Sequence, residues 1–85
     1  MERNLQPPSS LPTLAILGGT GKEGPGLAMR WALAGYPIII GSRKTEKAQA
    51  TAAQLNEQLN IETIKGKQNN KAAQSADICV LTVVY

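Results

Sequence analysis

The chain has 85 residues, of which 42% are hydrophobic and 18% are charged, and its formal net charge is +3. This length allows one small domain, and the hydrophobic content is typical of a folded protein rather than a disordered one. The nine basic residues are scattered, and the aromatic residues are only Trp31, Tyr36 and Tyr85. We therefore expect no nucleic-acid binding, which normally needs clustered charge with interleaved aromatic side chains.

A single cysteine, Cys79, and the lack of histidine exclude an internal disulfide and the common histidine-based zinc and acid–base sites. This cysteine usage indicates a reducing, cytoplasmic setting. Cys79 lies among apolar residues, where we expect a buried and unreactive thiol. No apolar run is long enough for a membrane-spanning helix, so no membrane contact is expected.

In chain order, residues 1–12 predict a disordered leader and residues 13–85 a single partial domain. Residues 13–17 form the first predicted strand, and residues 36–43, 61–66 and 77–85 the others. Between them, hydrophobic residues at helical spacing predict a helix that begins near Gly24 and ends at Gly35, and a second from 45 to 60 capped by Thr45. A short helical segment over 71–76 would be capped by Asn70.

Strict alternation of strands and helices predicts an α/β fold, a Rossmann-type parallel sheet with flanking helices, equivalent to the first half of a doubly wound fold. The last strand should pair with the first one near the centre of a complete sheet. Because a strand covered on both faces is an unusual end for a chain, we expect the sequence to be truncated. A natural half-domain completed by self-association is the alternative.

Three glycines, Gly19, Gly21 and Gly24, stand at G-x-G-x-x-G spacing between the first strand and the first helix. This pattern, in this context, is typical of a loop that binds a pyrophosphate at a helix N-terminus. Thr20 adds a hydroxyl for a phosphate or ribose, and Lys22 adds a positive charge. A glycine-rich turn that binds nothing is the alternative.

The end of the second strand predicts which dinucleotide binds. NAD-binding proteins carry Asp or Glu there, whereas this chain has Gly41 and Ser42, followed by Arg43 and then Lys47. A hydroxyl and two cations suit the 2′-phosphate of NADP. Alternatively, Ser42 only begins a helix and the charges are solvated; we expect Lys44 to be a surface residue.

With these motifs, residues 14–85 resemble the N-terminal part of the NADPH-dependent reductases of the deazaflavin coenzyme F420, the F420:NADP oxidoreductases. The resemblance rests on "AILGGTGKEGPGLAMRWALAGYPIIIGSRKTEKA" and on "ADICVLTVVY". Lys22 and Glu23 depart from the family pattern, which has less charged residues after Thr-Gly. Two other readings stay open: the NADP domain of another reductase, of the pyrroline-carboxylate or metalloreductase type, and a non-catalytic NADP-binding module.

The resemblance implies an NADP-dependent oxidoreductase that transfers hydride between NADPH and F420, with F420 as co-substrate and no catalytic side chain. It also implies that Thr20, Ser42, Arg43 and Lys47 hold the 2′-phosphate end of NADP. The backbone of Thr82, Val83 and Val84 would lie beside the nicotinamide. The full-length form is expected to be a homo-oligomer, and activity of the 85 residues alone is left open.

Overall fold

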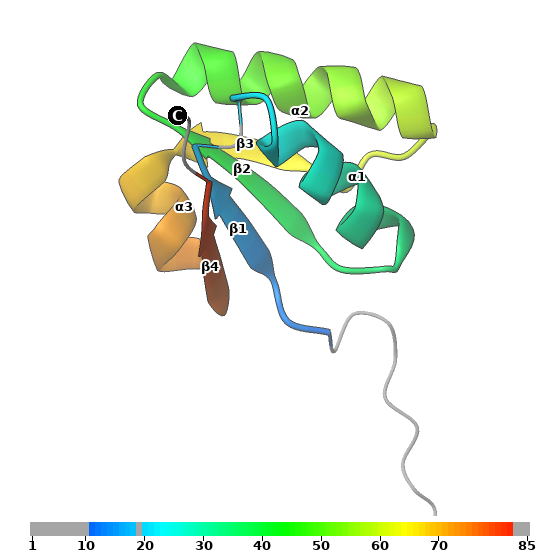
Figure 1. The fold of residues 1–85 in the computed structure, drawn as a ribbon, viewed down its shortest axis with the longest axis horizontal. Coiled ribbons are helices and arrows are strands. Elements are labelled where there is room, and N and C mark those ends of the chain that lie inside the picture. The colour runs from blue at the N-terminus through cyan, green and yellow to red at the C-terminus, as the bar shows by residue number, and fades with distance from the viewer. Residues whose placement is uncertain (1–10, 19, 83–85) are drawn as a thin grey trace, which may run out of the picture.

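A computed structural model of the chain describes residues 11–18 and 20–82 (Figure 1). Within these residues a parallel sheet has the strand order β3-β2-β1-β4. The elements are β1 (Leu14–Leu17), α1 (Gly24–Leu33), β2 (Ile38–Ser42), α2 (Thr45–Leu59), β3 (Lys65–Gln68), α3 (Asn69–Ser75) and β4 (Ile78–Leu81). The predicted Rossmann-type α/β sheet is therefore confirmed. Residues 1–10 of the predicted leader (1–12) and the end of the last predicted strand, 83–85, lie outside the described residues.

The helices cover the two faces of the sheet unequally: α1 and α2 pack on one face and α3 on the other (Figure 1). Because side chains alternate along a strand, β1 and β2 contribute to both sides. Ala15 and Ile39 pack with Ala72 of α3, and the α1 and α2 side has a larger cluster. Its buried members are Leu14, Ile16, Ala28, Ile38, Ile40, Ala48, Ala52, Leu55 and Ile64. This double coverage explains the continuous apolar run of β2.

The third strand is polar, and its position depends on Gly66. A Cβ at Gly66 would collide with the backbone of Ala48 and Gln49 in α2. Only a residue without a side chain allows the helix backbone to come this close to the strand. Strand β3 buries little apolar surface, and its close packing against α2 helps to hold it in the sheet.

The third strand begins at Lys65, so the prediction of a strand from Ile61 is wrong. Asn56 of α2 explains the difference. Its Oδ1 accepts a hydrogen bond from the Ile64 N–H at 3.0 Å, and its Nδ2 donates to the Ile64 carbonyl at 2.9 Å. Ile64 is buried, but a side-chain amide satisfies its backbone in place of a neighbouring strand.

Two predicted helix caps are also wrong. Thr45 is the first helical residue of α2, with Lys44 at the cap, and Asn70 lies inside α3 after the cap residue Gln68. Neither cap residue makes a side-chain capping hydrogen bond. Asn70 instead accepts a hydrogen bond from the N–H of its neighbour Lys71 at 2.8 Å.

The fourth strand pairs with β1 as predicted, but it is not covered on both faces within the described residues. Ile78 is 49% exposed and Leu81 71% exposed. Cys79 is an exposed free thiol, so the prediction of a buried thiol is wrong. The reason is positional, because α3 packs over β1 and β2 while β4 lies at the edge of the sheet (Figure 1).

No helix among residues 11–18 and 20–82 has the length and the apolar character needed to cross a membrane.

We expect Asn56→Ala to lower the free energy of unfolding by about 1–2 kcal/mol, because it leaves both backbone groups of buried Ile64 without a partner. The better helix propensity of alanine offsets part of the loss. Urea unfolding measures the change, and Gln54→Ala at an exposed position of the same helix is the control. Equal stability of the two variants would contradict this role of Asn56.

Candidate functional site

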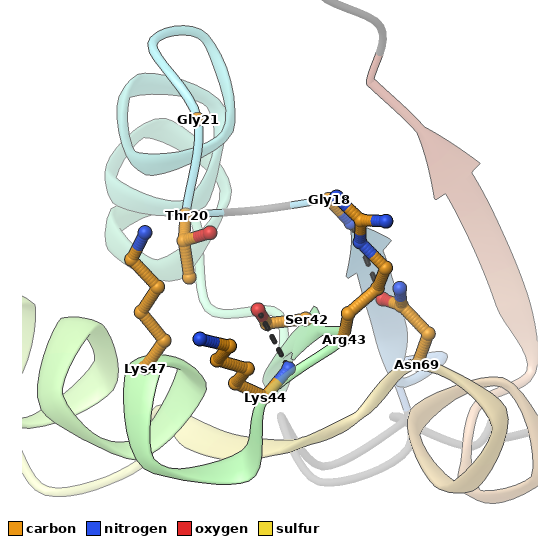
Figure 2. Close-up of a pocket in the computed structure, with 8 residues that line it drawn as sticks. All are labelled: Gly18, Thr20, Gly21, Ser42, Arg43, Lys44, Lys47 and Asn69. Carbon is orange, nitrogen blue, oxygen red and sulfur yellow. Dashed lines mark hydrogen bonds between the residues drawn. The ribbon is translucent and has the colours of Figure 1, made fainter.

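Parallel pairing brings the ends of β1 and β2 to the same edge of the sheet. Leu17, the last residue of β1, is paired with Gly41 of β2. The glycine loop and the Ser42–Arg43 segment therefore leave the sheet side by side. Between them lies a pocket of about 310 Å³. The described residues that line it are Gly18, Thr20, Gly21, Ser42, Arg43, Lys44, Lys47 and Asn69 (Figure 2).

The glycine loop turns immediately after β1. Gly18 has a φ of +75°, a conformation that glycine adopts without strain, and its carbonyl accepts a hydrogen bond from the Gly21 N–H at 3.1 Å. Helix α1 follows at Gly24, with Pro25 in its first turn. The loop thus ends at the backbone N–H groups that the first turn of a helix leaves unpaired.

The end of β2 forms the opposite wall of the pocket. Ser42 is buried, and its Oγ accepts a hydrogen bond from the Lys44 N–H at 3.3 Å, which turns the chain toward α2. The exposed Arg43 follows, and its carbonyl accepts a hydrogen bond from Gln68 Nε2 at 3.3 Å. Figure 2 shows Arg43 on the Asn69 side of the pocket and Lys47 on the other side.

The pocket is positively charged. Arg43, Lys44 and Lys47 line it, and none of its described lining residues is acidic. Such a site attracts anions, and the guanidinium fork of Arg43 matches the geometry of a phosphate. No group of three or more His, Cys, Asp or Glu side chains in the part of the chain that the structure describes is placed to hold a metal ion.

The structure brings five of the residues predicted for the site into this pocket: Thr20, Gly21, Ser42, Arg43 and Lys47. Their binding of a dinucleotide stays a prediction. Lys22 is exposed and is not among the lining residues, and Gly24 is buried at the start of α1. Gly19, Val83 and Val84 lie outside the described residues.

Three lining residues were not predicted for the site. Gly18 precedes the glycine motif, and Lys44 was expected to be a surface residue; it is exposed but also lines the pocket. Asn69 follows β3 directly, more than twenty residues after Lys47. The only sequence signal for Asn69 is its position after a parallel strand, where side chains gather at the carboxyl edge of the sheet.

Thr82 contacts the start of the glycine loop and does not line the pocket. Its Oγ1 is 2.9 Å from the Leu17 carbonyl oxygen and 3.0 Å from that of Gly18, and its N–H donates to Leu17 at 3.1 Å. The hydroxyl proton is thus shared between the last two carbonyls before the loop. Whether the Thr82 backbone also lies beside a nicotinamide stays a prediction.

Comparison with known sequences identifies relatives over most of the chain. The profile of the family described as "NADP oxidoreductase coenzyme F420-dependent" matches residues 13–85. F420-dependent NADP reductases from Methanothermobacter thermautotrophicus and Methanothermobacter marburgensis are each 47% identical over 72 residues, 82% of this chain. The reductase of that name from Methanocaldococcus jannaschii is 47% identical over 76 residues, 85% of this chain.

The chain spans about a third of the length of these relatives, 31%, 32% and 34% respectively. Among solved structures, the bulky-bulky ketone specific alcohol dehydrogenase from Comamonas testosteroni is similar in a tetragonal and an orthorhombic crystal form. Both give a TM-score of 0.55 at 29% identity. The match covers 69% or 68% of this chain and 24% or 23% of the dehydrogenase.

We expect Thr82→Val to lower the free energy of unfolding by about 1 kcal/mol, because the Leu17 and Gly18 carbonyls lose a donor while the side-chain volume is kept. Thermal or urea unfolding measures the difference. Thr63→Val, at an exposed position, is the matched control. A Thr82→Val protein as stable as this control would show that the shared hydroxyl proton contributes nothing.

Proposed function

Because the chain belongs to the family of coenzyme F420-dependent NADP oxidoreductases, we propose that it is the NADP-binding part of an enzyme that transfers hydride between NADPH and F420. The names of the curated relatives support this activity, and they support NADP and F420 as its reactants. The family match also favours this activity over that of pyrroline-carboxylate reductases or metalloreductases.

One observation carries the proposal: a single pocket joins the glycine loop to the cationic end of β2. NADP has two anionic groups on its adenosine half, the pyrophosphate and the 2′-phosphate. The loop N–H groups and the start of α1 suit the pyrophosphate. Ser42, Arg43 and Lys47 suit the 2′-phosphate, together with the hydroxyl of Thr20, which lines the same pocket.

The same wall favours NADP over NAD. A carboxylate at the end of β2 would accept hydrogen bonds from a ribose 2′-hydroxyl and repel a 2′-phosphate. Here that position holds Ser42, buried and turned toward Lys44, and the exposed Arg43 follows. Charge-assisted hydrogen bonds from this segment to a 2′-phosphate give about 2–4 kcal/mol of discrimination.

NADPH, when bound, would supply a hydride (two electrons with one proton) to the oxidised deazaflavin, and one proton from solvent would complete the reduction. The contribution of the chain is binding and orientation, for which no side-chain acid or base is required. Anchoring the adenosine half at the pocket fixes the direction in which the nicotinamide half extends from the glycine loop.

Three further proposals accompany this function. The protein works in the cytoplasm, since a chain with one cysteine, Cys79, has no internal disulfide to suit an oxidising compartment. Its full-length form is a homo-oligomer. It has no nucleic-acid partner, since its basic residues are not clustered with aromatic ones.

Replacing Arg43 tests the cofactor assignment. We expect the 85-residue chain to bind NADPH more tightly than NADH, and Arg43→Ala to weaken NADPH binding at least about tenfold while NADH binding changes little. Calorimetric titrations at two salt concentrations measure this, and the preference should shrink as salt increases. Arg30→Ala, at an exposed arginine in α1, is the control. Stronger binding of NADH, or no binding of either nucleotide, would contradict the proposal.

A chimera tests the reaction itself. The aligned part of this chain, 82% of it, replaces the matching part of the M. thermautotrophicus reductase. Reduction of F420 by NADPH is followed by the absorbance of the deazaflavin. We expect turnover by the chimera, and a loss of at least about tenfold in kcat/KM for NADPH when it carries Arg43→Ala. A folded chimera that binds NADPH but reduces no F420 would support a non-catalytic binding module instead.

A further inference from the structure

Asn69 links the end of β3 to the start of the glycine loop, although it belongs neither to the glycine motif nor to the Ser42–Arg43 segment. It is the first residue of α3, directly after β3, and its side chain is half-buried and lines the pocket (Figure 2). Its neighbour Asn70 is exposed and lies outside this pocket, in an adjoining one that it lines with Arg43, Gln68 and Asn69. Of the two adjacent asparagines, only Asn69 lines the pocket beside the glycine loop.

The side chain of Asn69 reaches across the sheet to the glycine loop. Its Oδ1 accepts a hydrogen bond from the Gly18 N–H at 3.3 Å, between residues 51 positions apart. Gly18 is where β1 ends and the loop begins, and its φ of +75° sets the direction of the turn. A contact at this N–H therefore restrains the first residue of the loop from the β3 side, while Thr82 restrains its carbonyl from the β4 side.

Gly41 makes this contact possible. Strand β2 lies between β3 and β1, so the Asn69 side chain must pass over β2 to reach Gly18. A Cβ on Gly41 would lie 2.7 Å from Asn69 Oδ1, 3.0 Å from Leu17 Cδ2 and 3.2 Å from Ala72 Cβ. Only a residue without a side chain leaves room for the amide to cross.

From this geometry we propose that Asn69 is a positioning residue for NADP, rather than a ligand of the 2′-phosphate. By crossing Gly41 and holding Gly18, it fixes the glycine loop at a set distance from Ser42 and Arg43. A dinucleotide that is anchored at both points gains affinity only when the two anchors have the correct separation. This inference rests on the proposed NADP function.

Comparing the binding of two ligands tests whether Asn69 acts by positioning the glycine loop. NADP uses the loop N–H groups and the Ser42–Arg43 segment, whereas adenosine 2′-monophosphate has no pyrophosphate and depends on the segment, with Lys47 and the Thr20 hydroxyl. We expect Asn69→Ala in the 85-residue chain to weaken NADP binding about fivefold to tenfold, the effect of one lost hydrogen bond. Binding of adenosine 2′-monophosphate should change less than about twofold. Gln74→Ala, at an exposed position of the same helix, is the control and should change neither affinity.

A second variant, Gly41→Ala, tests whether the Asn69 side chain must pass over Gly41. We expect the same selective loss of NADP affinity, because the added methyl group displaces the amide. In the double variant, Gly41→Ala with Asn69→Ala, the loss should be smaller than the sum of the two single losses, since both act on one contact. Additive losses would show that Gly41 and Asn69 act independently and would overturn the proposal.

The remaining outcomes are also decisive. If Asn69→Ala weakens both ligands equally, or neither, while the unaltered chain binds NADP, this proposal is wrong and the NADP function stands. If the unaltered chain binds no NADP, both fail together. Should the variants not fold, amide hydrogen exchange of the unaltered chain decides: a protected Gly18 N–H supports the contact, and exchange at the rate of an open loop overturns it.

Discussion

Parallel pairing of β1 with β2 is the constraint on which the whole site depends. Because the two strands run in the same direction with Leu17 paired with Gly41, the glycine loop and the Ser42–Arg43 segment emerge at one edge of the sheet. An antiparallel neighbour would send one of them to the opposite edge. The glycine loop and the cationic wall are thus brought together by the topology before any side chain takes part. Helices α1 and α2 stabilise that topology by packing together on one face of the sheet.

Two asparagine side chains hydrogen-bond to backbone groups that the small hydrophobic core does not hold in place. The α3 side of the core contains mainly small residues, Ala15 and Ala72 with Ile39, so α3 packs close to the sheet. That closeness lets Asn69 reach Gly18. On the other side of the sheet, Asn56 pairs with the backbone of Ile64 where no strand is available. A chain of this size buries little apolar surface, so hydrogen bonds of this kind position its loops without a larger core.

Most of the fold could be predicted from the sequence because its signals are local. The isoleucine run of β2, the glycines after β1 and the helical spacing of α1 and α2 each report on the immediate neighbours of a residue. Two errors, at the third strand and at Cys79, occurred where another element of the fold decides. Ile61 and Ile64 have strand character, but Asn56 binds the backbone of Ile64 and the strand begins at Lys65. Cys79 lies in an apolar segment, yet its strand is at the sheet edge and the thiol is exposed.

The sequence by itself determined the strand–loop–helix unit that contains Thr20 and Gly21, and the presence of Ser42 and Arg43 in place of a carboxylate at the end of the second strand. Both are contiguous motifs whose chemistry depends on neighbouring residues alone. Only the tertiary structure showed that Asn69 crosses Gly41 to reach Gly18, and that the exposed Lys44 lines the same pocket. An asparagine or a lysine has no periodic pattern that reveals its partner, because that partner is set by how closely the strands and helices pack.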